Sequence, residues 1–172
     1  MFLDSIQRYQ ITEVALVTPI VLALLGLPVA KRETVLRCLR MLWCGGAPLS
    51  VRDQNSLSDL CHPEARFSQV WGLTEMGWIT TTHYPEKDRS GSVGRLLPGN
   101  EAMIIDEQGE TVTALYGQGE ILLRGPSVMM GYLDQPEATT SMLKDGWLHT
   151  GDIGYTRNGK WYIVDRAKVS HY

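Results

Sequence analysis

A run of nine residues at positions 67–75 carries side chains that could together bind one phosphorylated ligand. It leads from an expected strand into a turn with an aromatic ring, a glycine, a hydroxyl and a carboxylate, at Trp71, Gly72, Thr74 and Glu75. A ring can stack on a base, a glycine admits a phosphate, a hydroxyl donates to it, and a carboxylate can hold Mg²⁺. The same pattern is also typical of a helix start, with Thr74 as the N-cap. From this run alone, both interpretations stay open.

Besides this run, three further segments along the chain carry recognisable motifs. They read Cys-Gly-Gly-Ala-Pro-Leu-Ser at 44–50, Gly-Glu-Ile-Leu-Leu-Arg-Gly-Pro at 119–126 with Gly-Tyr-Leu at 131–133, and Asp-Gly-Trp-Leu-His-Thr-Gly-Asp-Ile-Gly at 145–154 followed by Trp-Tyr-Ile-Val-Asp-Arg at 161–166. Together the four segments closely resemble the adenylate-forming (AMP-binding) superfamily of acyl-CoA synthetases, luciferases and peptide-synthetase adenylation domains. The branch that they most resemble is the 4-coumarate–CoA ligase-like one. The resemblance extends from about residue 9 to 168 and corresponds to the second half of the family's large N-terminal domain.

The resemblance implies a two-step reaction in the parent enzyme. Members of this family activate a carboxylic acid with ATP and Mg²⁺, release pyrophosphate, and pass the acyl group to a thiol. It therefore implies ATP or AMP and Mg²⁺ as cofactors, CoA as co-substrate and a small carboxylic acid as substrate. Attack of a carboxylate on the α-phosphorus needs neutralisation of charge more than a protein nucleophile.

The resemblance also assigns roles to particular residues. Glu75 matches the metal-holding carboxylate and Thr74 the hydroxyl that contacts phosphate, so these two are the expected catalytic residues. Trp71 and Gly72 match the aromatic and glycine beside the adenine. A second nucleotide-binding turn has its backbone along the adenine, where small side chains suit the approach of a flat ring. Its residues are Gly45, Gly46, Ala47 and Pro48. Without the resemblance, those glycines are equally typical of a plain strand-to-helix turn.

The last motif supplies three charged residues. Asp152 matches the acid that accepts from both ribose hydroxyls, which suits a carboxylate with two acceptor oxygens. Taken alone, it could equally be a turn-capping aspartate. Arg166 matches a basic residue near ribose and phosphate, and Lys168 falls on the hinge position before the family's C-terminal lid domain. By composition alone, both would be solvated surface charges.

The chain departs from the family pattern at several points. Val70 stands where glycine is usual and is expected to narrow or block the acyl pocket. Neither the lysine-bearing phosphate loop nor the C-terminal lid domain is found in these residues. We therefore expect a fragment of an acid–CoA ligase that is inactive as an isolated chain. The alternative is a non-catalytic remnant that binds nucleotide, or a protein partner along exposed sheet edges.

Bulk properties narrow the class of protein. A formal net charge of −3 gives no indication of a nucleic-acid partner. The longest apolar run, at 14–30, is interrupted by prolines and a glycine, so we expect no membrane span. Three cysteines without metal spacing favour free thiols in a reducing compartment. A cytoplasmic location is expected, with a peroxisomal one left open for a full-length parent.

Apolar periodicity predicts an α/β fold in two parts. Strands are expected at 11–18, 39–44 and 65–70, separated by helices that start at Pro19 and Pro48, with the second running to about residue 61. Short joints between them favour a parallel βαβ lobe at 1–84, with ligand loops at the carboxyl ends of the strands.

The second half of the chain has a different pattern. Short strands at 102–105 and 119–124, a helix at 136–143 and a hairpin around Asn158-Gly159 predict a small, mostly antiparallel β lobe at 92–168 that ends at the hinge.

Overall fold

The structure is a computed structural model that describes residues 2–28 and 35–166. The chain divides into two units, which are described separately. The first comprises Met1–Trp71 and Thr81–Gly94, and the second comprises Gly72–Thr80 and Arg95–Tyr172. Residues 72–80, which the sequence analysis placed in the first lobe, group with the second unit. One reason is backbone pairing, because the Leu97 N–H donates to the Ile79 carbonyl oxygen at 2.9 Å.

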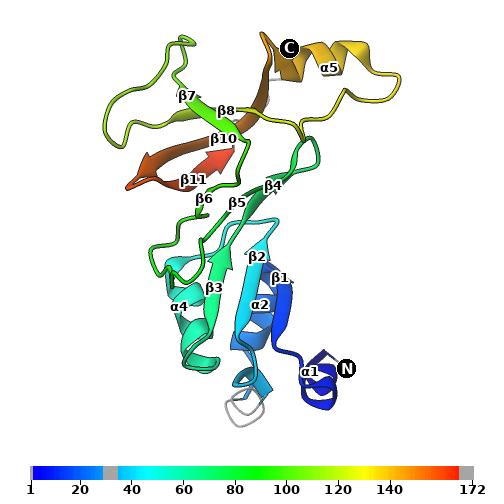
Figure 1. The fold of residues 1–172 in the computed structure, drawn as a ribbon, viewed down its shortest axis with the longest axis vertical. Helices are drawn as coiled ribbons and strands as arrows, with labels where there is room; N and C mark the ends of the chain where they lie inside the picture. Colours follow the sequence, from blue (N-terminus) through cyan, green and yellow to red (C-terminus); the bar gives the residue numbers. More distant parts are fainter. Residues whose placement is uncertain (1, 29–34, 167–172) are drawn as a thin grey trace. The chain divides into compact units, whose positions relative to one another are not determined.

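The first unit is built on a parallel sheet of three strands, β1 (Glu13–Val17), β2 (Met41–Gly45) and β3 (Arg66–Gln69), in the order β1-β2-β3. Its helices are α1 (Phe2–Tyr9), α2 (Thr18–Leu25) and α4 (Val51–Leu60), seen with the sheet in Figure 1. Since α2 and α4 contact each other, both cover the same face of the sheet. The predicted parallel α/β arrangement is confirmed.

The helix starts follow from local chemistry. Pro19 lies in the first turn of α2, where its missing N–H costs no hydrogen bond. The second helix begins at Val51, three residues later than predicted, because Ser50 is its N-cap. The Ser50 hydroxyl oxygen accepts from the Asp53 N–H at 3.1 Å. Pro48 therefore stays in the preceding turn.

A buried polar network crosses the first unit beside its apolar core. The core gathers residues from every element, among them Ile6, Leu16, Val21, Leu42, Leu57 and Phe67. Next to it, the Gln69 Nε2 donates to the Gln54 Oε1 at 2.7 Å. The Gln54 Nε2 in turn donates to the Asp88 carbonyl oxygen at 2.7 Å. These bonds fasten the segment 82–94 to α4 and β3.

A small sheet of three strands, in the order β4-β5-β6, carries the chain between the units. Its strands are β4 (Trp71–Leu73), β5 (Gly77–Thr81) and β6 (Arg95–Leu96). Residues 71–75 are therefore a strand and a tight turn, and no helix follows them. The helix-start interpretation of Thr74 and Glu75 is wrong, because the residues after the turn pair as a strand.

The second unit contains an antiparallel sheet in the order β11-β10-β8-β7. Its strands are β7 (Glu101–Ile105), β8 (Gly119–Arg124), β10 (Trp147–Arg157) and β11 (Lys160–Arg166), with β9 (Leu143–Lys144) paired to β10. A helix, α5 (Pro136–Met142), precedes β9 (Figure 1). Asn158 and Gly159 have φ angles of 53° and 71°, as a tight hairpin requires. The predicted antiparallel lobe is confirmed, although the long strand β10 was not predicted.

Among the described residues, no helix is both long and apolar enough to cross a membrane.

Candidate functional site

Glu75 lies in the tight turn between β4 and β5. The Met76 N–H closes the turn on the Leu73 carbonyl oxygen at 3.2 Å, and the Met76 side chain is buried. Gly77 ends the turn with a φ of 74°, a conformation that glycine adopts without strain. Because Met76 points inward, Thr74 is left exposed and Glu75 half-buried. The turn thus presents a hydroxyl and a carboxylate side by side.

A loop distant in sequence holds Glu75 at two points. The Tyr132 hydroxyl donates to the Glu75 Oε1 at 2.5 Å, and the Met129 N–H donates to the Glu75 carbonyl oxygen at 2.7 Å. The hydrogen bond to Glu75 raises the pKa of Tyr132, and burial and the negative charge of Glu75 raise it further. Tyr132 belongs to the Gly-Tyr-Leu motif at 131–133, and the sequence alone assigned it no role.

Asp152 lies in β10 where the pairing of that strand changes register. Its backbone N–H donates to the Thr150 hydroxyl oxygen at 3.0 Å, and that hydroxyl donates to the Ile121 carbonyl oxygen at 2.6 Å. The Gly151 N–H donates to the Glu120 Oε1 at 3.0 Å. These bonds to β8 fix the backbone before Asp152, so the carboxylate is held by a strand and not by a free turn.

His149 also has a partner in this part of the sheet. Its Nδ1 lies 3.3 Å from the Glu120 Oε2, the second oxygen of the same carboxylate. This contact gives His149 a hydrogen-bonding partner within the sheet.

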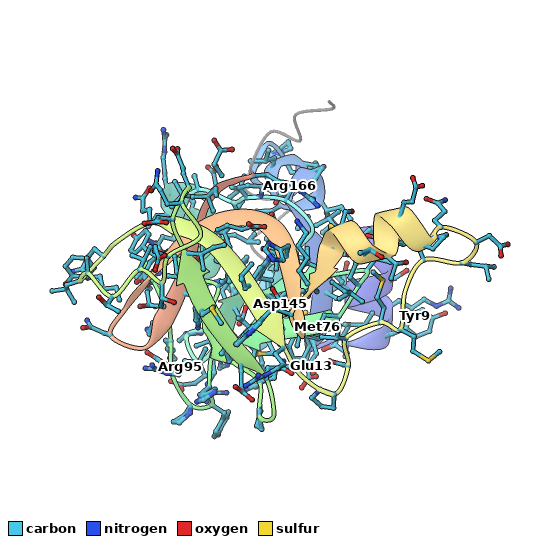
Figure 2. The ribbon with its side chains drawn as sticks, turned by 90° about the horizontal axis from the view of Figure 1, so that it is seen from above. Tyr9, Glu13, Met76, Arg95, Asp145 and Arg166 are labelled. Carbon is cyan, nitrogen blue, oxygen red and sulfur yellow. The ribbon has the colours of Figure 1, made fainter. Side chains whose placement is uncertain are left out.

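Arg166 links Asp152 to the Glu75–Tyr132 pair. Arg166 and Asp152 are register partners on β11 and β10, and the Arg166 Nε lies 3.8 Å from the Asp152 Oδ1. The Asp152 side chain is 9% exposed and the Arg166 side chain 68%. The charge of Arg166 also lowers the pKa of Tyr132 and so opposes the raising effect of Glu75. We call Glu75, Tyr132, Asp152 and Arg166 the acidic–basic cluster; Figure 2 labels Arg166 on its strand and Met76 in the Glu75 turn.

The glycine turn after β2 lies in the first unit. Gly46 has a φ of 82°, and Gly46, Ala47 and Pro48 are exposed. A Cβ on Gly45 would lie 2.8 Å from the Val70 Cγ2, so only glycine fits beside that valine. The Thr18 hydroxyl donates to the Ala47 carbonyl oxygen at 2.9 Å and fixes the turn to the start of α2. The turn therefore offers open, rigid backbone.

Two of the predicted residues need separate mention. Trp71 is 7% exposed, so most of its ring surface contacts protein. Lys168, the expected hinge, lies outside the described residues. The glycine turn belongs to the first unit, whereas Glu75 and Asp152 belong to the second.

The donor set at Glu75 suits Mg²⁺ that arrives with a nucleotide. Within residues 2–28 and 35–166, no three His, Cys, Asp or Glu side chains gather as a metal cage. Magnesium is commonly bound by one or two carboxylates together with phosphates and water, and needs no such cage. Glu75 has one carboxylate oxygen engaged by Tyr132, and the exposed hydroxyl of Thr74 lies beside it in sequence. Glu75 and Thr74 therefore suit a Mg²⁺ ion that is already coordinated by the phosphates of a nucleotide.

Comparison with known proteins decides the family. The family model described as AMP-binding enzyme matches residues 1–133. The chain belongs to the AMP-binding enzyme family. Its relatives within that family include a phenylacetyl-CoA ligase of Aspergillus niger, 45% identical over 98% of this chain and 32% of the ligase. Another is 4-coumarate–CoA ligase 2 of Oryza sativa subsp. japonica, 37% identical over 96% of this chain and 30% of that protein.

Solved structures agree with this membership of the AMP-binding family. The ATP-bound structure of MatB from Rhodopseudomonas palustris superposes with a TM-score of 0.83 at 30% identity, covering 96% of this chain and 32% of that one. The chain thus spans about a third of the length of the AMP-binding relatives that it matches. The recognition of the family from four ordered motifs is confirmed.

Proposed function

We propose that this chain is part of an ATP-dependent carboxylic acid–CoA ligase, in which it supplies much of the nucleotide site. The observation that carries the proposal is the match along 98% of the chain to a phenylacetyl-CoA ligase, together with the cluster that holds Glu75 and Asp152. The parent enzyme would convert a carboxylic acid and ATP to an acyl-adenylate, and then to an acyl-CoA.

Each residue of the cluster has a task in this proposal. Glu75 would hold the Mg²⁺, which supplies positive charge to the phosphates, and Thr74 would donate to a phosphate oxygen. Asp152 would accept from the two ribose hydroxyls. Its carboxylate is fixed for this by its backbone contact to Thr150 and by Arg166. Arg166, mostly exposed, would contribute positive charge near ribose and phosphate.

The first unit would supply the adenine-binding residues. The backbone of 45–48 is open and lacks bulky side chains, which suits a flat ring lying along it. Trp71, beside Gly72, would stack on the adenine. Val70 fills the space next to Gly45 and would narrow an acyl pocket there, so we propose a small or flat acid as substrate. Three free cysteines suit the reducing environment of the cytoplasm.

The direct test is AMP binding by the purified 172-residue chain, measured by calorimetry. Asp152→Asn should abolish detectable heat, because an amide donates where the ribose hydroxyls need an acceptor. Asp145→Asn is the matched control. Asp145 is exposed in the turn before β10, and asparagine, like aspartate, can adopt the φ of 51° found there. Equal AMP affinity in the intact chain and in Asp152→Asn would contradict the proposal.

A second candidate function, that of an interaction module, is favoured by features of the first unit alone. The strand β1 is an outer strand of its sheet. Next to it, α1 and α2 line an apolar groove of about 430 Å³, formed by Phe2, Leu3, Pro19, Ile20, Ala23 and Leu27. A protein partner would pair with the strand edge or fill the groove. Sedimentation of the chain at rising concentration tests self-association, and a monomer without AMP binding would contradict both candidates.

A further inference from the structure

The contact between Tyr132 and Glu75 has no place in the roles assigned above. It joins two residues 57 positions apart, and both lie in the second unit. A phenol that donates to a carboxylate forms a charge-assisted hydrogen bond, which is stronger and shorter than one between neutral groups. The bond engages Oε1 of Glu75, so the second carboxylate oxygen can face a ligand.

Tyr132 is itself held in place by its own loop. Its backbone N–H donates to the Thr139 hydroxyl oxygen at 2.8 Å, and that hydroxyl donates to the Gln135 carbonyl oxygen at 2.9 Å. The Gln135 N–H closes the loop on the Tyr132 carbonyl oxygen at 3.2 Å. The loop is fastened at its other end by the Met129 N–H on the Glu75 backbone. These bonds therefore hold Tyr132 in a fixed position beside Glu75.

We propose that Tyr132 is a positioning residue for Glu75, which orients one carboxylate oxygen toward the Mg²⁺ of a bound nucleotide. The inference rests on the proposed function, because it needs a nucleotide that carries Mg²⁺ to the turn. Groups that orient a metal-binding carboxylate commonly change metal affinity 10–100-fold when they are removed. Tyr132 acts only through Glu75 and needs no contact with the substrate.

The experiment measures binding with and without metal. For the 172-residue chain and for Tyr132→Phe, calorimetry gives the affinity for ATP in Mg²⁺ and for AMP in EDTA. We expect the Mg²⁺-dependent gain in ATP affinity to fall about 10-fold in Tyr132→Phe, with AMP affinity in EDTA within about 2-fold of the parent. Tyr155→Phe is the matched control, because its ring stacks on Tyr162 with centroids 4.9 Å apart, outside the cluster. An unchanged Mg²⁺-dependent gain in Tyr132→Phe would overturn the proposal, as would an equal loss in Tyr155→Phe.

The same calorimetry separates this inference from the proposed function. Absence of AMP binding by the intact chain in EDTA would refute the proposed function. AMP binding by the intact chain, with a Mg²⁺-dependent gain in ATP affinity that is unchanged in Tyr132→Phe, would refute the positioning role alone.

Discussion

Four side chains of the second unit bring two carboxylates, a phenol and a guanidinium together. Tyr132 and Arg166 each contact one carboxylate, Glu75 and Asp152 respectively, and Arg166 also acts on Tyr132 through its charge. Partial burial of Asp152 strengthens its interaction with Arg166, because screening by water is reduced there. At this scale, the cluster presents two carboxylates, Glu75 held by the Tyr132 phenol and Asp152 paired with the Arg166 guanidinium.

Replacing Trp71 with alanine tests the stacking role. We expect AMP affinity to fall by about 1–3 kcal/mol, the range for a ring stacked on a base. Since Trp71 is only 7% exposed, its truncation also removes buried contacts and should lower the melting temperature. Trp78→Ala, at a tryptophan that is 47% exposed, is the control for loss of an indole. AMP affinity that is the same in Trp71→Ala, in a variant that remains folded at the assay temperature, would refute the stacking role.

Cys61 should make the stability of the first unit fall at alkaline pH. Burial raises the pKa of this thiol from 9.0 to about 12, and the neighbouring Cys38 adds to the effect. The folded state therefore keeps a proton that the unfolded chain loses above pH 9. The contribution of the protonated Cys61 thiol to the free energy of unfolding is fully present below pH 9 and is lost as pH rises toward 12.

The measurement is denaturant unfolding of the intact chain and of Cys61→Ala between pH 8 and about pH 11. The difference in unfolding free energy between them should shrink as pH rises, with a slope that approaches one proton per molecule. A difference that stays constant over that range would show that the thiol titrates equally in both states.

At the scale of elements, short motifs hold strands and turns in fixed positions. The Thr150 hydroxyl donates to the Ile121 carbonyl oxygen of β8, and the Gly151 N–H donates to the Glu120 carboxylate of the same strand. These two bonds fix the chain just before Asp152. The Thr18 hydroxyl, which donates to the Ala47 carbonyl oxygen, ties α2 to the turn at 45–48. The backbone before Asp152 and the turn at 45–48 are therefore each held by an element other than their own.

The buried hydrogen bonds of Gln54 should contribute more to the free energy of unfolding than any exposed side chain of α4. Gln54→Ala removes the donor to Asp88 and the acceptor for Gln69, and leaves buried polar groups without these partners. We expect a loss of about 1–3 kcal/mol in unfolding free energy. Arg52→Ala, at an exposed position on the same helix, should change it by less than about 0.5 kcal/mol. Equal losses in the two variants would contradict the role of the network.

At the scale of the whole molecule, the chain holds only part of what its relatives contain. It spans about a third of their length, and the resemblance implies a lysine-bearing phosphate loop and a C-terminal lid domain outside the matched segment. The two described units carry the carboxylates and the open backbone turn. The cationic groups that would neutralise a triphosphate are expected elsewhere in the parent enzyme.

A polypeptide of these 172 residues should therefore bind AMP without turning over. Loss of a single charge-stabilising group typically costs about 10²–10³ in rate, and two missing groups should bring pyrophosphate exchange to background. The assay is ATP–pyrophosphate exchange over a panel of aromatic and fatty acids. Acid-dependent exchange that disappears in Glu75→Gln would show that these residues suffice for adenylation.

The sequence by itself determined the class of fold and the family. Apolar runs around β1, β2 and β3 predict buried strands because hydrophobic periodicity is a local property, and Asn158-Gly159 predicts its hairpin for the same reason. The four motifs identified the family because their types and order are written along the chain. The same motifs single out Glu75, Asp152 and Arg166 as candidate site residues.

Only the tertiary structure decided what supports those residues. Whether a helix starts at Thr74 depends on whether the residues after it pair as β5, and such pairing depends on residues remote from the turn. The contact of Tyr132 with Glu75 across 57 residues, and the hydrogen bond between Glu120 and Gly151, are likewise set by how loops and strands pack. A sequence pattern records the spacing of neighbours, whereas these bonds depend on distances in space that packing alone fixes.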